Sequence, residues 1–335
     1  MTSVPVENQF SGSGLRPVNL RTDLAALADL MELVFADSMD QGGRAAVREM
    51  RTLSRIGVGI SLLPGLNDLT HGINMGYVWV ENNRLVGNVS IYPTRKPYRN
   101  TWIIANVGVH PDYQRRGIAT ELMRASMDTI RARGGEHAIL QVDADNHTAR
   151  RLYERLGFVN ERGWILWRRS GSLRIPPPLD NQVAHVTHLR RGEWRAEYEL
   201  ARRVRPAEQG GIGWQRPLDI HLFRKPLLRQ IGDWLNMRHE ERLVIRSDDE
   251  QHILASLWVE GGLLTTSTQL TLMVAPEYQG VYDNVLLNTA VRRFSSRGTA
   301  LMIEHPADET ITNEVLRSYH FRPQRDVIHM RWDVK

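Results

Sequence analysis

Two similar hexapeptides, identical at four of six positions, occur in this 335-residue chain, and this repetition constrains the fold more than any other feature. Residues Val109–Gln114 read VHPDYQ, and residues Val274–Gln279 read VAPEYQ. Each copy follows an apolar stretch that predicts a strand and precedes a stretch that predicts a helix. A second pair, Leu156-Gly-Phe158 and Tyr319-His-Phe321, follows in the same order and at nearly the same separation. The chain is therefore predicted to contain an internal duplication of a unit of roughly 150 residues.

The first copy predicts strands and helices in an order that suits a mixed sheet with helices on its faces. The Asn82-Asn83 pair separates two expected strands and suits a hairpin turn. The Gly-rich region 38–76 is expected to be irregular. Expected strands cover 15–20, 77–81, 85–92, 102–109, 138–142 and 164–168, with another near 158, and expected helices cover 22–36, 117–133 and 147–156.

Three consecutive prolines, Pro176–Pro178, mark the expected boundary between the copies. Such a run cannot continue a helix or lie in a central strand, so it indicates a semi-rigid linker. The predicted organisation is a flexible N-terminus over 1–14, a first domain over 15–170, a linker over 171–182 and a second domain over 183–335.

Composition excludes several classes of function. The chain has no cysteine, which excludes disulfides, thiolate nucleophiles and cysteine zinc sites. Its 43 Lys and Arg residues against 38 Asp and Glu residues give a net charge of +5 without a long basic block, which argues against nucleic-acid binding. No apolar stretch is long enough to span a membrane, and the N-terminus lacks the order of a secretory signal. We expect a cytoplasmic protein with no membrane partner.

The strongest chemical signal follows the first hexapeptide copy, where a strand is expected to lead through a short loop into a helix. The first N–H groups of a helix have no intrahelical acceptor and lie at the positive end of its dipole, so they form an anion site. Gly117 would let a phosphate approach the backbone, and Arg115 and Arg116 add charged donors. The alternative is that both arginines belong to an ordinary solvated turn.

This loop resembles the central motif of the GCN5-related N-acetyltransferase (GNAT) superfamily, Q/R-x-x-G-x-G/A at a strand-to-helix junction. The resemblance covers most of residues 15–170. It extends to Asn146–Phe158, which is similar to the family block N-x-x-A-x-x-L-Y-x-x-x-G-F and closest in style to protein N-terminal acetyltransferases. The family fold that it implies is a mixed, mostly antiparallel central sheet flanked by helices, here present in tandem. Ala119 replaces the commoner second glycine, which its small size should allow.

The resemblance implies acetyl-CoA as co-substrate, with no metal. The CoA pyrophosphate would lie on the loop and the helix start, and the pantetheine arm would lie along the preceding strand as an added pseudo-strand. A backbone N–H near Val109 would stabilise the oxyanion. The residues that this assigns to the cofactor are Val107, Gly108, Val109, Gln114, Arg115, Arg116, Gly117, Ile118, Ala119, Thr120 and Asn146.

The same resemblance points to Tyr153 as the general acid that protonates the leaving thiolate. Tyr153 also lies on one apolar helix stripe with Ala149, Leu152 and Leu156, so it can equally be a core residue. Asn146 has a similar pair of readings, as a helix N-cap or as a contact to the pantetheine amide.

The general base is not identified by the sequence. The expected strand before the loop has no Asp or Glu, where many family members carry a glutamate. A water relay or a residue elsewhere would then serve, and His110 and His71 are candidates that are more often ordinary surface residues. His185 and His188 are only an i, i+3 pair and do not predict a metal site.

The second copy has lost the features that favour phosphate. Tyr282 aligns with Gly117, both arginines are gone, Asp283 would repel a pyrophosphate, and Leu316 aligns with Tyr153. This half is predicted to be a degenerate acetyltransferase fold that completes an acceptor groove or holds the pair of domains together. Tandem folds of this kind are also known in mycothiol synthase, where the C-terminal unit is the active one.

We expect an acetyl-CoA-dependent N-acetyltransferase that acts by direct attack of an amine on the thioester. Its partner would be a primary amine of a small molecule or peptide, and the protein would be a monomer or a homodimer. The alternative is a non-catalytic acetyl-CoA-binding sensor, which the missing strand glutamate favours.

Overall fold

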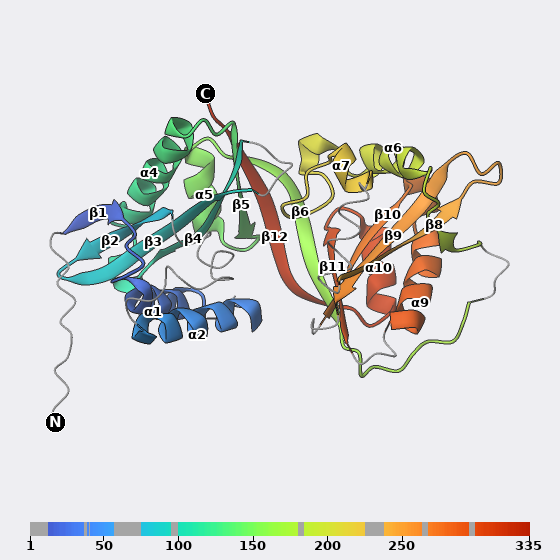
Figure 1. Cartoon of the computed structure of the whole chain (residues 1–335), viewed down its shortest axis with the longest axis horizontal. Helices are drawn as coiled ribbons and strands as arrows, with labels where there is room; N and C mark the ends of the chain where they lie inside the picture. The colour runs from blue at the N-terminus through green and yellow to red at the C-terminus, as the bar shows by residue number, and fades with distance from the viewer. Residues whose placement is uncertain are drawn as a thin grey trace. The chain divides into compact units, whose positions relative to one another are not determined.

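The computed structural model describes residues 13–36, 39, 41–56, 75–94, 100–179, 184–224, 238–262, 267–294 and 299–335. Contacts divide the chain into two compact units. The first unit contains Met1–Leu140, Thr148–Val159 and Arg331–Lys335, and the second contains Gln141–His147 and Asn160–Met330. In each unit, helices cover both faces of a sheet (Figure 1).

The sheet of the first unit has the strand order β1-β2-β3-β4-β5. Its strands are β1 (Gly14–Pro17), β2 (Gly76–Glu81), β3 (Arg84–Pro93), β4 (Thr101–Val109) and β5 (His137–Asp143). The pairs β1–β2, β2–β3 and β3–β4 are antiparallel, whereas β4–β5 is parallel. Asn82 and Asn83 have φ values of 50° and 62° in the tight turn between β2 and β3, as the hairpin prediction required.

Helices α1 (Leu24–Val34) and α2 (Gln41–Ile56) lie on one face of this sheet, and α4 (Ile118–Ala132) lies on the other (Figure 1). Helix α5 is His147–Arg155. Helix α2 corrects the prediction that region 38–76 is irregular. Its Val47, Met50 and Leu53 are spaced three apart and pack on Leu24 and Ala28 of α1, so an apolar face stabilises a helix that begins with two glycines.

The sheet of the second unit has the order β12-β6-β11-β10-β9-β8-β7. The pair β10–β11 is parallel, and the pairs β6–β11, β9–β10, β8–β9 and β7–β8 are antiparallel. The strands are β6 (Val159–Arg169), β7 (Thr187–His188), β8 (Arg238–Arg246), β9 (Ile253–Gly262), β10 (Ser267–Val274), β11 (Ala300–Pro306) and β12 (Arg322–Asp333).

Helices α6 (Trp194–Val204) and α7 (Ile220–Phe223) cover one face of this second sheet, and α9 (Tyr282–Phe294) and α10 (Thr310–Ser318) cover the other (Figure 1). One apolar cluster joins α9 to the strands through Leu286, Leu287 and Leu257. A separate cluster on the α6 side contains Leu200 and Trp258.

The element order confirms the duplication. Strands β3 and β4, the 3-10 helix η2 (Pro111–Tyr113), α4, β5, α5 and β6 recur as β9, β10, the 3-10 helix η4 (Pro276–Tyr278), α9, β11, α10 and β12. The mixed, mostly antiparallel sheet predicted for each repeat is also confirmed. One detail differs, because 159–169 forms a single strand instead of two short ones.

The two compact units divide the chain differently from the predicted ranges 15–170 and 183–335. Strand β6 closes the first repeat in sequence, but it pairs with β11 of the second repeat, with Trp167 opposite Ile303. The end of the chain belongs to the first unit, where Trp332 packs on Phe158 and the N–H of Val334 donates to the carbonyl of Glu136. Each repeat therefore contributes its last strand residues to the other repeat's unit.

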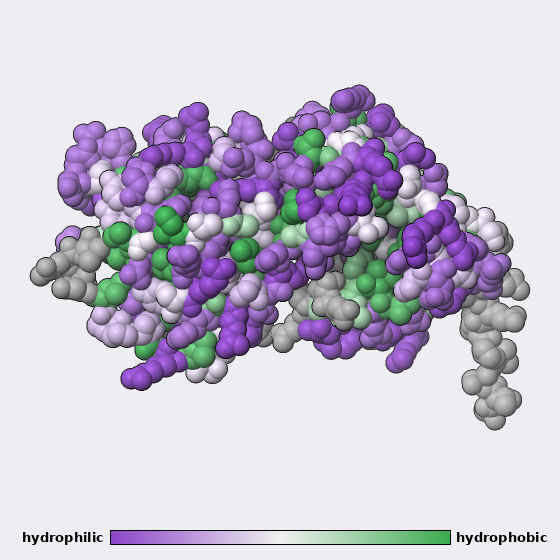
Figure 2. Space-filling model, turned by 180° about the vertical axis from the view of Figure 1, so that it is seen from behind, coloured by the Kyte–Doolittle hydropathy of each residue, from purple (hydrophilic) through white to green (hydrophobic). Residues whose placement is uncertain are grey.

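The face drawn in Figure 2 is mostly hydrophilic, with hydrophobic residues in smaller areas between the polar ones. Among the residues that the structure describes, no helix combines the length and apolar character needed to cross a bilayer. The same residues contain no group of three or more His, Asp or Glu side chains arranged to hold a metal ion.

Candidate active site

The loop between β4 and α4 forms an open cradle at the start of a helix. Helix η2 leads to Arg115 and Gly117, which have left-handed φ values of 60° and 83°. No side chain caps α4, and the N–H groups of Thr120 and Glu121 are the first to donate to the carbonyl of Gly117. The N–H groups before them therefore lack intrahelical acceptors at the positive end of the helix.

Gly117 leaves the approach to this helix end open. A Cβ built on Gly117 would meet no atom within 4 Å, so a side chain would enter empty space in front of the helix. Its left-handed backbone also favours glycine for conformational reasons. Ile118 is buried, and Ala119 and Thr120 are partly buried, so the loop anchors the helix while its outer rim stays exposed.

The two arginines of the loop have different surroundings. Arg116 donates to the carbonyl of Asp112 at 3.0 Å, lies 3.3 Å from the Glu81 carboxylate and covers the ring of Tyr113. Arg115 is exposed and makes no hydrogen bond or ion pair within the described ranges, so its charge is available to an anion. The side chain of Gln114 donates to the carbonyl of Val109 at 3.2 Å and ties the loop to the end of β4.

Strand β4 presents an open backbone edge next to the cradle. Its parallel pairing with β5 runs from Thr101 opposite His137 to Ile103 opposite Ile139. On its other side, β4 pairs with β3 as far as Val109. Within the described residues, no strand pairs with the edge of Val107–Val109 that faces away from β3, and the Gln114 side chain donates to the Val109 carbonyl near it. An extended chain could add there as a further strand.

A bulge in β4 sets the direction of this edge. The register shifts between Asn88 and Ser90, and Asn106 has a φ of 54°, a left-handed conformation that asparagine tolerates better than most residues. The Asn106 amide donates to the Ser90 hydroxyl, and the Asn88 amide donates to the Asn106 carbonyl. Sequence reasoning missed Asn106, although an asparagine inside an apolar strand is the signal for such a bulge.

Tyr153 is buried in α5, with only 6% of its surface exposed. Its ring contacts Phe158, with centroids 6.0 Å apart, and no described residue hydrogen-bonds its hydroxyl. Burial raises the pKa of Tyr153 well above its usual value, so the phenol keeps its proton at neutral pH. Tyr153 is the buried residue of the predicted apolar stripe, whereas Ala149, Leu152 and Leu156 are partly exposed.

Asn146 and His110 complete the predicted set. Asn146 is exposed in the turn before α5, where its N–H donates to the carbonyl of Asp143. It lies in the segment Gln141–His147, which belongs to the second compact unit. His110 is buried, not a surface residue as expected. Its Nδ1 accepts from the Asp112 N–H and its Nε2 lies 2.8 Å from Arg84, so the ring fixes the loop. His71 lies outside the described residues.

The corresponding loop of the second unit keeps the backbone path but closes the helix end. Gly280, the counterpart of Arg115, also has a left-handed φ, at 86°. Asp283 is fully buried at the first turn of α9, where its carboxylate accepts from the Asn284 N–H and from the Thr312 hydroxyl, both at 2.8 Å. Tyr282 stacks on Tyr278 in the place of Gly117. An internal carboxylate therefore occupies this helix N-terminus.

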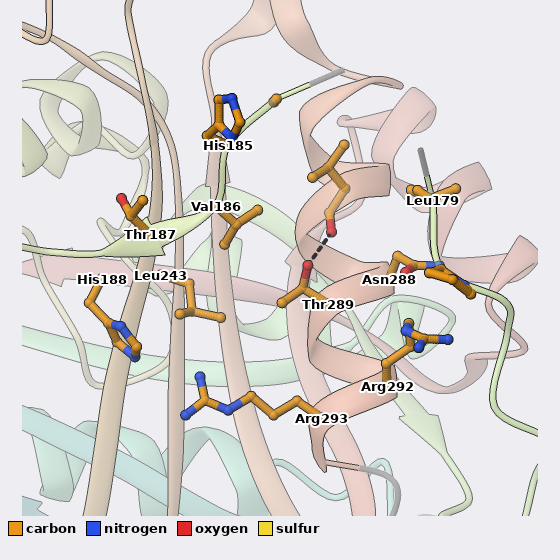
Figure 3. Close-up of a pocket in the computed structure, with 13 residues that line it drawn as sticks. Leu179, His185, Val186, Thr187, His188, Leu243, Asn288, Thr289, Arg292 and Arg293 are labelled. Carbon is orange, nitrogen blue, oxygen red and sulfur yellow. Dashed lines mark hydrogen bonds between the residues drawn. The ribbon is translucent and has the colours of Figure 1, made fainter. Parts of the chain in front are cut away.

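The second unit also contains a cavity of about 560 Å³. It lies between α9 and the strands β7 and β8, and Figure 3 shows Arg293 reaching toward β8 while Arg292 points to the other side of the helix. Arg292 donates to the carbonyl of Pro176 and Asn288 donates to that of Pro177. The cavity thus lies where the linker carbonyls of Pro176 and Pro177 accept hydrogen bonds from α9. None of the predicted cofactor or catalytic residues lines it.

Comparison with known proteins gives a family match within the first repeat. Residues 60–158, which contain β4, the cradle, α4 and Tyr153, match the model of the acetyltransferase (GNAT) family. This stretch of the first repeat is similar to GNAT acetyltransferases. The whole chain has the fold of tandem GNAT proteins, since it superposes on a GCN5-related N-acetyltransferase from Sphaerobacter thermophilus with a TM-score of 0.60, at 16% identity over 96% of this chain and 95% of the other.

A tandem GNAT protein from the clavulanic acid biosynthesis pathway gives a TM-score of 0.53, at 14% identity over 97% of this chain and 99% of the other. At such identities the likeness concerns the fold. The second repeat, which sequence alone identified through two short matches, is thus a GNAT-like fold.

Curated relatives share shorter stretches with this chain. N-alpha-acetyltransferase 30 of Schizosaccharomyces pombe is 34% identical over 24% of this chain and 55% of its own length. Mycothiol acetyltransferase of Corynebacterium aurimucosum is 38% identical over 19% of this chain and 21% of its own. Ribosomal protein bS18-alanine N-acetyltransferase of Escherichia coli K12 is 43% identical over 16% and 36%. The matches cover about half of these relatives or less.

Proposed function

We propose that the protein is an acetyl-CoA-dependent N-acetyltransferase that moves an acetyl group to a primary amine of a small molecule or peptide. The observation that carries the proposal is the conjunction of an uncapped helix start at Gly117 with an open edge on the adjoining β4. The GNAT model matches this same stretch of the chain. Homology to acetyltransferases that differ in their acceptors leaves the amine to experiment.

Coenzyme A would bind in the first repeat along these two features. Its pyrophosphate would accept from the free N–H groups at the start of α4, with Arg115 as the additional cation. Its pantetheine amides would pair with the backbone of Val107 and Val109. Gly117 would lie under the phosphates, which need the space that a side chain at this position would occupy; no atom lies within 4 Å of a Cβ built on Gly117.

The reaction follows from these positions without a covalent enzyme intermediate. Acetyl-CoA supplies a thioester, and the neutral amine attacks its carbonyl carbon to form the C–N bond. The N–H of the bulged strand near Val109 would stabilise the oxyanion. The C–S bond then breaks, and Tyr153, which burial keeps protonated, would give its proton to the thiolate.

The amine must lose a proton in the same reaction, and β4 carries no carboxylate to take it. The polar groups around the bulge are the neutral Asn88, Ser90 and Asn106, which can hydrogen-bond a water but cannot hold its proton. We assign the proton to water. This arrangement favours acceptors whose amine is largely neutral at the working pH.

The second repeat would bind no CoA. Asp283 is buried where a pyrophosphate would have to approach, and its carboxylate already accepts from the Asn284 N–H in the first turn of α9 and from the Thr312 hydroxyl. Tyr282 replaces the glycine that keeps the first cradle open. One CoA for each chain is therefore expected.

Two measurements test the proposal. Calorimetry with CoA should give one site for each chain, which Gly117→Tyr abolishes while the matched change Tyr282→Gly in the second repeat leaves the stoichiometry at one. Thiol release from acetyl-CoA should then be followed with a panel of small primary amines and peptides with free N-termini. Binding without turnover on the whole panel would favour the acetyl-CoA sensor, and two equivalent CoA sites would contradict the assignment.

A further inference from the structure

A buried arginine of the second unit links two positions that correspond to predicted pantetheine contacts of the first repeat. The hexapeptide alignment pairs Val274 with Val109, so Leu272 corresponds to Val107. The second match pairs Phe321 with Phe158, so Glu309 corresponds to Asn146. In the second unit, Arg205 bonds to both Leu272 and Glu309.

The contacts of Arg205 are complete and internal. Only 1% of the surface of Arg205 is exposed to solvent. One guanidinium nitrogen, Nη2, donates to the Leu272 carbonyl at 2.9 Å and to the Glu309 carboxylate at 3.2 Å. The other, Nη1, donates to the Val204 carbonyl at 2.8 Å and to Glu309. Such a set satisfies a buried charge and fixes its position.

These contacts lie where β10 and β11 separate. Their parallel pairing runs from Ser267 opposite Ala300 to Leu270 opposite Ile303. Leu272 lies beyond the last pair, so its carbonyl belongs to the same kind of open edge that β4 presents in the first unit. Arg205 covers this edge with hydrogen-bond donors, as an added ligand amide would.

Glu309 is held from two more sides. Arg162 of β6 donates to it at 3.0 Å and to Asp308 at 2.9 Å, and the Nε2 of His305 lies 3.0 Å away. Two arginines, Arg162 and Arg205, therefore face the buried Glu309, and the exposed Asp308 pairs with Arg162 at the surface. The first repeat has a neutral asparagine at the position of Glu309, so the charge arises only where Arg205 is present to neutralise it.

The position from which Arg205 enters also has a counterpart in the first repeat. Arg205 is the C-cap of the eleven-residue helix α6, and Phe35 is the C-cap of the eleven-residue helix α1. A Cβ built on Gly108 would lie 3.4 Å from the Phe35 ring, so Phe35 borders β4 beside the open edge without polar contacts to it. The C-cap position of this helix therefore carries a side chain that hydrogen-bonds to the strand edge in the second repeat and an apolar side chain in the first.

We propose that the second repeat retains the pantetheine groove of an acetyltransferase and that Arg205 of the same chain permanently occupies this groove as an internal ligand. This assignment rests on the proposed CoA site of the first repeat, from which the corresponding positions are taken. In this assignment, the Arg205 side chain takes the place of a ligand in the second unit and cannot dissociate, because it belongs to the same chain. The site that Arg205 leaves when truncated should bind an alkylguanidinium ion.

Arg205→Ala and ethylguanidinium test this directly, because alanine plus ethylguanidinium supplies the atoms of the missing arginine. We expect Arg205→Ala to lower the Tm by roughly 6–20 °C, since it leaves the buried Glu309 carboxylate with Arg162 in place of two arginines and removes the donor to the Leu272 carbonyl. Millimolar ethylguanidinium should recover a large part of that loss, and ethylammonium at equal concentration should not. The control Arg203→Ala removes an exposed arginine paired with Glu277 and should shift the Tm by less than about 4 °C without rescue.

An Arg205→Ala variant that matches Arg203→Ala in stability, or that gains nothing from ethylguanidinium over ethylammonium, overturns the proposal. If the single variant does not fold, Arg205→Met with Glu309→Met decides, because apolar residues of similar size should fill the groove without an unpaired charge. A folded double variant supports the proposal and an unfolded one overturns it. These readouts need no CoA, so a wild-type protein that fails to bind CoA would refute the proposed function separately.

Discussion

Replacing Tyr153 with phenylalanine separates the two roles that its position allows. The change keeps the ring against Phe158 and removes only the hydroxyl. If the hydroxyl protonates the leaving thiolate, turnover at neutral pH should fall by roughly 10²–10⁴, which is about 3–5 kcal/mol of barrier. Affinity for CoA should stay within a few-fold, because the phenol acts on the sulfur only as the C–S bond breaks.

The structure sets the expected cost in stability close to zero. No described residue hydrogen-bonds the Tyr153 hydroxyl, so its removal breaks no internal bond and leaves no partner unsatisfied. Tyr77→Phe is a matched control in the same unit, because the Tyr77 hydroxyl lies 2.6 Å from that of Thr129. That change should cost about 1 kcal/mol of stability and leave turnover unchanged.

The pH dependence gives an independent readout. Burial raises the folded pKa of Tyr153 above the unfolded value of about 10, so the native state is favoured below that pH and loses this advantage as pH rises further. Tyr153→Phe should lack this alkaline loss. The turnover ratio of wild type to variant should shrink toward pH 8.5 and above, because the thiolate then leaves readily without a proton. Turnover within a few-fold of wild type at neutral pH, with chemistry shown to limit the rate, would remove Tyr153 from the mechanism.

Three further changes test other parts of the structure. Asn106→Val should lower kcat far more than Asn106→Gly, because a β-branched residue resists the φ of 54° that the bulge requires, whereas glycine adopts it readily. Equal effects of the two changes in steady-state kinetics would show that the bulge is unimportant. Asp283→Ala should destabilise the protein by roughly 1–2 kcal/mol in urea without adding a second CoA site, since Tyr282 still closes the loop. Burial alone would raise the pKa of Glu309, but Arg205 and His305 lower it to about 2. The ionised carboxylate therefore contributes stability above the unfolded pKa near 4.5, and this contribution should be lost as the pH drops toward 2. Glu309→Gln should flatten that part of the profile of unfolding free energy in urea against pH.

The cradle could be predicted from sequence because its determinants are local. The glycine, the arginines and the expected strand before them lie within a dozen residues, and the free N–H groups follow from any helix that starts there. The hairpin at Asn82-Asn83 was predictable for the same reason. Both depend on backbone conformations that a few adjacent residues decide.

Features that depend on distant residues were not predictable. Helix α2 contains Gly42 and Gly43 in its first turn, and their low helix propensity hid an apolar stripe that packing on α1 stabilises. Arg205 lies in the sequence Arg-Arg-Val-Arg-Pro, which is typical of a solvated helix end, and only Glu309, 104 residues away, explains its burial. The pairing of β6 with β11 likewise joins residues that no local pattern connects.

The two repeats place different side chains on one backbone path. Both loops run through a 3-10 helix, a glutamine in extended conformation and a left-handed residue, so the backbone path is set by the chain itself and not by CoA. What differs is the chemistry placed on that path. In the second repeat a carboxylate satisfies the helix end and a guanidinium satisfies the open strand edge, and both groups belong to the same chain. Since each unsatisfied backbone group is costly when buried, the bonds from Asp283 and Arg205 stabilise the second repeat where, in our proposal, the first repeat would use a bound ligand.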